Sequence, residues 1–150
     1  MKKIFTLLAL IISFSMNAQM DDNSIGTSAT GANAVAMGMG TTASGSISTA
    51  MGNGTEATGS RSTAMGSGTL ASGNNSTAMG YQTTASGHKT TAMGAQTIAS
   101  DYASLVIGQF NSSGSSVTNN ATSYNTANTA FVIGNGADSS NKSDAFKVMF

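Results

Sequence analysis

The stretches STAMGSGTLASGNN at residues 62–75 and STAMGYQTTASGHK at residues 76–89 are consecutive copies of one fourteen-residue unit. The Ala-Met-Gly of this unit recurs at residues 36–38, 50–52, 64–66, 78–80 and 92–94, and residues 106–108 supply the variant Val-Ile-Gly one period later. A short, fixed period is typical of solenoids, in which each unit packs only on its neighbours. The repeat therefore predicts a stacked architecture and not a closed globular core.

A shorter period of seven lies inside each unit. Two pentads of the form [Ser/Thr]-x-Ala-x-Gly, each followed by two residues, place Ala at every seventh position from Ala29 to Ala99 and Gly from Gly31 to Gly94, after which Asp101 takes the place of Gly. A coiled coil also has a period of seven, but each Gly would cost a helix about 1 kcal/mol, and its seam needs Leu or Ile. We predict five-residue strands joined by two-residue turns, with the pentad Gly supplying the positive φ of the turn.

The alternation of side chains along a strand indicates what fills the roll. Positions 1, 3 and 5 of a pentad face one way and positions 2 and 4 the other. The two strands of so short a coil lie nearly back to back, so only the small residues fit between them. The opposite arrangement, with Met inside and Ala outside, is the alternative. The predicted core consists of Ala43, Ala50, Ala57, Ala64, Ala71, Ala78, Ala85 and Ala92.

The outer positions of the two pentads differ from each other. Position 4 of the second pentad is Ser or Thr, whereas position 4 of the first pentad is a large apolar residue in coil after coil. Soluble monomers rarely expose so long an apolar band, and burying one Met side chain is worth about 1.5–3 kcal/mol. We predict that copies of the chain associate around a common axis through this band. The predicted interface residues are Met37, Met51, Met65, Met79, Met93 and Ile107.

The alternation of Ser-Thr-Ala-Met-Gly with Thr-x-Ala-Ser-Gly closely resembles the YadA-like head repeat of trimeric autotransporter adhesins over residues 25–112. That family usually has Ile or Val where this chain has Met. The resemblance implies an all-β, left-handed parallel β-roll of fourteen-residue coils, assembled as a homotrimer. It also implies a protein at the bacterial cell surface, or secreted, that binds extracellular matrix proteins or other cell-surface molecules. The same repeat occurs in tail-fibre-like proteins, so a structural shaft with no ligand of its own is the alternative function.

The two ends of the chain differ from the repeat. Residues 1–18 have a basic start at Lys2 and Lys3, an apolar run and a small residue at Ala18, which is typical of a signal peptide and too short for a permanent membrane span. We expect an exported protein with head repeats over residues 19–112 and an irregular loop with C-terminal strands over residues 113–150. The apolar residues of these strands fit a cap over the open end of the roll. The chain stops within the last predicted strand, which favours a truncated sequence.

The composition excludes most chemistry. The chain has no Cys, its one histidine is His88, and its acidic residues are scattered, so we expect no zinc site, no cofactor and no enzyme activity. It has no basic stripe for nucleic acid. Ice binding is disfavoured because paired Thr-x-Thr columns are missing. We expect ligand contacts on the hydroxyl-bearing face and the turns, where many weak sites act together. The candidate contact residues are Glu56, Arg61, Leu70, Tyr81, His88 and Lys89.

Overall fold

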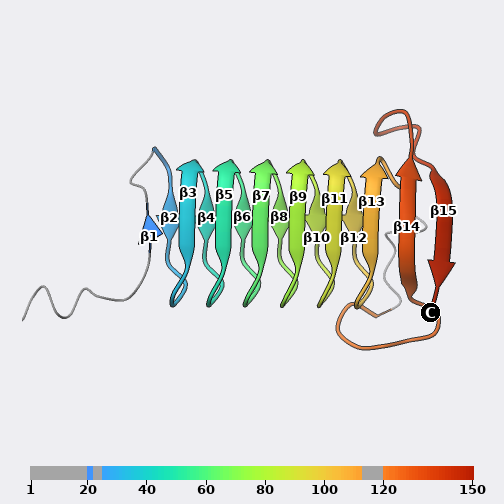
Figure 1. Cartoon of the computed structure of the whole chain (residues 1–150), viewed down its shortest axis with the longest axis horizontal. Coiled ribbons are helices and arrows are strands. Elements are labelled where there is room, and N and C mark those ends of the chain that lie inside the picture. The colour runs from blue at the N-terminus through green and yellow to red at the C-terminus, as the bar shows by residue number, and fades with distance from the viewer. Residues whose placement is uncertain (1–19, 22–24, 113–119) are drawn as a thin grey trace, which may run out of the picture.

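The computed structural model describes residues 20–21, 25–112 and 120–150. Within these residues the chain forms strands and turns, and the coils stack side by side into an elongated roll (Figure 1). Each coil contributes one long and one short strand. The long strands are β3 (Val35–Met39), β5 (Thr49–Asn53), β7 (Thr63–Ser67), β9 (Thr77–Tyr81), β11 (Thr91–Ala95) and β13 (Leu105–Gln109). The short strands are β2 (Ser28–Ala29), β4 (Thr42–Ala43), β6 (Glu56–Ala57), β8 (Leu70–Ala71), β10 (Thr84–Ala85) and β12 (Ile98–Ala99).

Two sheets form the walls of the roll, and their strands are parallel except for the last one at the C-terminal end. The short strands make a six-stranded sheet, and the long strands, together with β1 (Met20–Asp21) and the C-terminal strands, make a nine-stranded sheet. Equivalent residues of successive coils are paired, so that Ala64 lies beside Ala78 and Met65 beside Met79. This register confirms the predicted all-β solenoid with fourteen-residue coils.

The two strands of a coil are unequal, which corrects the expectation of two five-residue strands. The long strand has five residues, whereas the short strand has two. After Ala57 the N–H groups of Thr58 and Gly59 both donate to the carbonyl oxygen of Ala71, at 3.0 and 3.1 Å. Two consecutive donors on one acceptor require the backbone to bend. The extended conformation therefore ends after Ala57, the third residue of the second pentad.

Alanine fills the space between the sheets. The alanines of the seven-residue period from Ala36 to Ala99 have no exposed surface, and Val106 and Val132 continue their column. The Ser or Thr at position 1 of the pentads from Thr41 to Ser104 is also buried, and Ser62 and Thr90 donate hydrogen bonds of 2.7 Å to the carbonyls of Gly59 and Gly87. The alternative with Met inside is wrong, because the small side chains occupy the whole interior.

Residues with a positive φ occur in the turns on both edges of the roll, but the glycine of the pentad is not always one of them. In the Met-containing pentads that glycine does have a positive φ, for example 119° at Gly66. In the other pentads the second of the two residues that follow the glycine has the positive φ, as Arg61 (56°) and Lys89 (60°) do. Gly59, whose φ is not positive, is required for another reason. A Cβ there would collide with the carbonyl oxygen of Gly73 in the next coil.

The C-terminal part rejoins the nine-stranded sheet after an irregular excursion. Residues 120 and 121 run beside the turns, where the carbonyls of Asn120 and Ala121 accept hydrogen bonds from Tyr102 and His88, at 2.9 and 2.7 Å. Strand β14 (Thr129–Asn135) then pairs in parallel with β13, so that Leu105 faces Phe131. Strand β15 (Asp144–Met149) returns antiparallel to β14.

The expected apolar cap over the end of the roll is not what β15 forms. Its Phe146 pairs with Ile133 and its Val148 with Phe131. Paired residues of an antiparallel ladder lie on the same face, so these large side chains lie on the outer face of the sheet. Strand β15 therefore adds one more strand at the end of the nine-stranded sheet, and its apolar side chains do not cover the interior. The predicted signal peptide at residues 1–18 lies outside the residues that the structure describes.

Candidate functional site

The outer face of the nine-stranded sheet carries an unbroken row of large apolar side chains, which we call the apolar ladder. Each member pairs with the next across adjacent strands, so the row crosses eight strands without a polar interruption. The last two members were not among the residues predicted from the sequence. The ladder consists of Met37, Met51, Met65, Met79, Met93, Ile107, Ile133 and Phe146.

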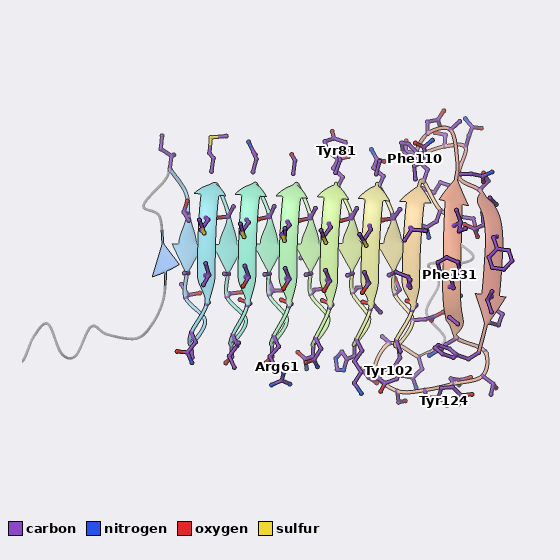
Figure 2. The ribbon with its side chains drawn as sticks, viewed as in Figure 1. Arg61, Tyr81, Tyr102, Phe110, Tyr124 and Phe131 are labelled. Atoms are coloured by element: carbon purple, nitrogen blue, oxygen red, sulfur yellow. The ribbon has the colours of Figure 1, made fainter. Side chains whose placement is uncertain are left out.

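A second column runs beside the ladder at position 2 of the same strands. In the middle of the roll it is threonine, from Thr49 to Thr91, with Val35 before it. Towards the C-terminus it becomes Leu105 and Phe131, and the Phe131 ring meets the Phe146 ring edge to face at 6.1 Å. The apolar surface therefore widens at the C-terminal end of the sheet, where Figure 2 labels Phe131.

The ladder lies on the outside of the roll because small side chains already fill the interior. Met37 and Met93 are 37% and 38% exposed, and the three methionines between them are half-buried by their neighbours in the row. Phe146 is 51% exposed. Soluble monomers rarely expose so long a contiguous apolar band, which makes the ladder a candidate interaction surface.

The candidate ligand-contact residues lie on three separate surfaces. Glu56 and Leu70 are neighbours on the outer face of the six-stranded sheet. Arg61, His88 and Lys89 lie in the turns that follow the short strands, an edge we call the short-strand edge. Tyr81 ends β9 and lies on the opposite edge of the roll. Figure 2 labels Tyr81 on one edge and Arg61 on the other. The structure thus does not gather these six residues into one site.

The short-strand edge is held together by side-chain contacts between coils. The Lys89 ammonium donates to the Tyr102 hydroxyl at 2.7 Å and lies 5.0 Å from the centre of the same ring. Nε of Arg61 donates to Oδ1 of Asn75 at 2.8 Å. Sequence reasoning did not assign Tyr102 this contact, because the pairing depends on residues thirteen apart stacking in adjacent coils.

The profile of the YadA head domain repeat matches this chain in overlapping pairs of repeats, at residues 25–41, 29–55, 43–69, 57–83, 71–97 and 85–111. Together the matches cover the coils that form the roll, and more than half of the chain. The chain belongs to the YadA head-repeat family. Neither a curated protein nor a solved structure gives a match.

This YadA head repeat has no cluster of metal-binding side chains among its described residues, since no three His, Cys, Asp or Glu groups lie together there. In the same residues, no helix is long and apolar enough to cross a membrane. Asp101 is buried, and its carboxylate accepts a 2.7 Å hydrogen bond from the N–H of Thr129. Asp101 therefore ties the irregular excursion to the last regular turn and is not simply a substitute for a turn glycine.

Proposed function

We propose that this chain is the head of an exported bacterial adhesin, a left-handed β-roll that works as a homotrimer. In this proposal three copies pack their apolar ladders around a common axis. The six-stranded sheets and the turn edges then face outwards and present the binding surface. The observation that carries the proposal is the ladder itself: eight large apolar residues in register on the outside of a roll whose interior is filled by alanine.

The energetics favour covering the ladder. Full burial of a Met or Ile side chain is worth about 1.5–3 kcal/mol, and the half-buried members gain part of that. Closed rotational symmetry buries every ladder at once and leaves none free, whereas an open arrangement leaves one at each end. The YadA head-repeat family supports the threefold solution.

Oligomeric state tests the assembly. Light scattering after gel filtration should give a trimer for the chain that starts at residue 19. A Met65→Lys, Met79→Lys double variant places two adjacent charges on the ladder and should be monomeric with unchanged β-sheet circular dichroism. The matched control is Thr58→Lys, Ser72→Lys, which places two charges at exposed positions directly after β6 and β8 and should remain a trimer. A well-folded monomeric parent chain would rule out the assembly.

Adhesion is proposed to arise from repetition. The outward surface has no single concentrated site, because the candidate contact residues are spread over one sheet face and two turn edges. Three copies of many weak contacts can still give firm attachment to a surface that repeats in the same way. Immobilised collagen and fibronectin are suitable probes of the matrix-binding hypothesis.

A structural shaft is the second candidate, and the same dispersal of contact residues favours it. Backbone hydrogen bonds run from coil to coil along both turn edges, for example from the N–H of Arg61 to the carbonyl of Ser46 and from that of Gln82 to Ser67. Such a roll can act as a spacer. Trimeric protein that binds neither matrix protein nor cultured cells would favour the shaft over the adhesin.

A further inference from the structure

We propose that the methionines of the apolar ladder are a modification site, at which oxidation to the sulfoxide blocks self-association and leaves the roll folded. The proposal rests on the proposed assembly through the ladder. It goes beyond that assembly because it makes the association of unassembled chains sensitive to peroxide. The residues concerned are Met37, Met51, Met65, Met79 and Met93.

The first argument is chemical. The chain has no Cys and no Trp, so the thioethers of its methionines are the side chains most readily oxidised by peroxides. In this step the sulfur lone pair attacks one oxygen of hydrogen peroxide, the O–O bond breaks, an S–O bond forms, and the second oxygen leaves as water. The sulfur loses two electrons and the peroxide gains them. Each event converts an apolar side chain into a polar one.

The second argument is the position of the sulfur atoms. The ladder methionines lie in register on adjacent parallel strands, from Met37 beside Met51 to Met79 beside Met93. Neighbouring strands are about 4.7–4.9 Å apart, so the sulfoxides would form one continuous polar row. A polar group buried without a hydrogen-bond partner is unfavourable, and the apolar members of the ladder carry no donor for the sulfoxide oxygens.

The third argument is that, among the described residues, the buried hydrophobic core contains no sulfur. The core is alanine with Val106 and Val132, and all these side chains are fully buried. Oxidation of the ladder therefore changes the outer face of the nine-stranded sheet and leaves the packing between the sheets untouched. The expected product is a folded roll in which five ladder positions are polar and only Ile107, Ile133 and Phe146 remain apolar.

The test begins with unfolded chain in denaturant, so that all methionines react with hydrogen peroxide alike. After the oxidant is removed and the chain is refolded by dilution, we expect normal β-sheet circular dichroism and a monomer by light scattering. Mass spectrometry should show one added oxygen per methionine. Incubation with methionine sulfoxide reductases A and B should restore the oligomer.

Two variants separate the ladder from the other methionines. Replacement of the five ladder methionines by Leu keeps the row apolar and removes the sulfur, so this variant should assemble after peroxide treatment. The matched control is Met39→Leu, Met149→Leu, because these residues are 54% and 43% exposed and lie outside the ladder. The control should lose assembly on oxidation as the parent chain does.

The outcomes distinguish the two proposals. A parent chain that is monomeric before treatment defeats the proposed assembly. A parent chain that assembles equally well with oxidised ladder methionines overturns only the present inference. Loss of the β-sheet signal on oxidation also overturns it, because the damage would then lie in the roll itself. In an independent measurement, peroxide applied to the assembled protein should oxidise Met39 before Met65, because Met39 lies outside the ladder.

Discussion

The side-chain amide of Asn111 makes two hydrogen bonds to the backbone of Ile98. Its Oδ1 accepts from the Ile98 N–H at 2.7 Å, and its Nδ2 donates to the Ile98 carbonyl at 3.0 Å. Ile98 begins β12, the last strand of the six-stranded sheet, so these are the groups that another parallel strand would otherwise pair. One buried side chain thus replaces a strand and ends the sheet.

Replacing Asn111 with Ala should destabilise the C-terminal end of the roll. Each buried backbone group that loses its partner costs about 1–3 kcal/mol, and the change exposes two such groups of Ile98. Denaturant unfolding followed by circular dichroism measures the loss. Asn111→Asp keeps the acceptor but sets a buried carboxylate oxygen against the Ile98 carbonyl oxygen, so it should cost at least as much. Asn53→Ala, at an exposed position, should be neutral. Equal stability of Asn111→Ala and the parent would refute this role.

The close stacking of glycines predicts a sharp contrast between two substitutions to Ala. Gly66 has φ 119°, and a Cβ there would collide with the carbonyl oxygen of Gly80. Gly54 has φ 58°, and a Cβ there would meet nothing within 4 Å. Gly66→Ala should therefore cost about 4 kcal/mol or more, in the range of severe substitutions. Gly54→Ala should cost about 1 kcal/mol, as expected for a residue placed in the left-handed region. Thermal unfolding of both variants at one protein concentration makes the comparison.

The full alanine core predicts that even one larger side chain is poorly tolerated. Ala78 has no exposed surface and lies between Ala64 and Ala92 of the neighbouring coils. Ala78→Leu should cost at least about 1–3 kcal/mol by overpacking. Its neighbour Thr77 points to the outer face, in the column where Leu105 occurs naturally, so Thr77→Leu is the control. Similar unfolding midpoints for the two variants would mean that the interior can hold a larger side chain, which would contradict the prediction.

The fold was predictable because its two periods are visible in the sequence. Ala at every seventh residue marks the interior, and Met at every fourteenth marks one outer face, and the structure places both sets accordingly. The unequal strand lengths were not predictable, because the bend after Ala57 depends on two N–H groups converging on a carbonyl of the next coil. Asn111 looked like any asparagine in a polar stretch. Its role exists only once the chain brings it beside Ile98.

The last two members of the ladder show the same limit at the candidate site. Ile133 lies in the sequence Phe-Val-Ile-Gly at residues 131–134, which is similar to Leu-Val-Ile-Gly at residues 105–108. Its place in the row follows from the register of β14 with β13. Phe146 lies in a strand that runs in the opposite direction. Its pairing with Ile133 depends on a hairpin whose register shifts between Ile133 and Gly134. Alternation of apolar residues along β15 could not by itself show which face would be the outer one.

The hairpin between β14 and β15 should respond to acid. The pKa of Asp138 is lowered from 3.8 by hydrogen bonds from the Asn141 side chain and from the N–H groups of Ser140 and Asn141. A lowered pKa means that folding favours the carboxylate. The contribution is present above the unfolded pKa and is lost as the pH falls through the folded value. The amide resonances of Ser140 and Asn141 should therefore shift below pH 3.8 in the parent, and not in Asp138→Asn.

The Phe131–Phe146 pair allows roll stability and assembly to be measured separately. The edge-to-face contact is worth about 0.5–1.5 kcal/mol, and Phe146 is still 51% exposed within one chain. Phe146→Ala should therefore lower the unfolding free energy of a monomeric background, Met65→Lys with Met79→Lys, by only about 1 kcal/mol. In the assembling chain the same change removes a ring from the end of the ladder in every copy. On dilution, the protein concentration at which half of the assembly has dissociated should therefore rise. The rise should be larger than the unfolding free energy lost within a single chain explains. Phe146→Leu keeps an apolar side chain in the row and should recover most of the assembly. If Phe146→Ala weakened the monomer and left the dissociation midpoint unchanged, the ladder would end before β15, and the interface would be confined to the coils of the repeat.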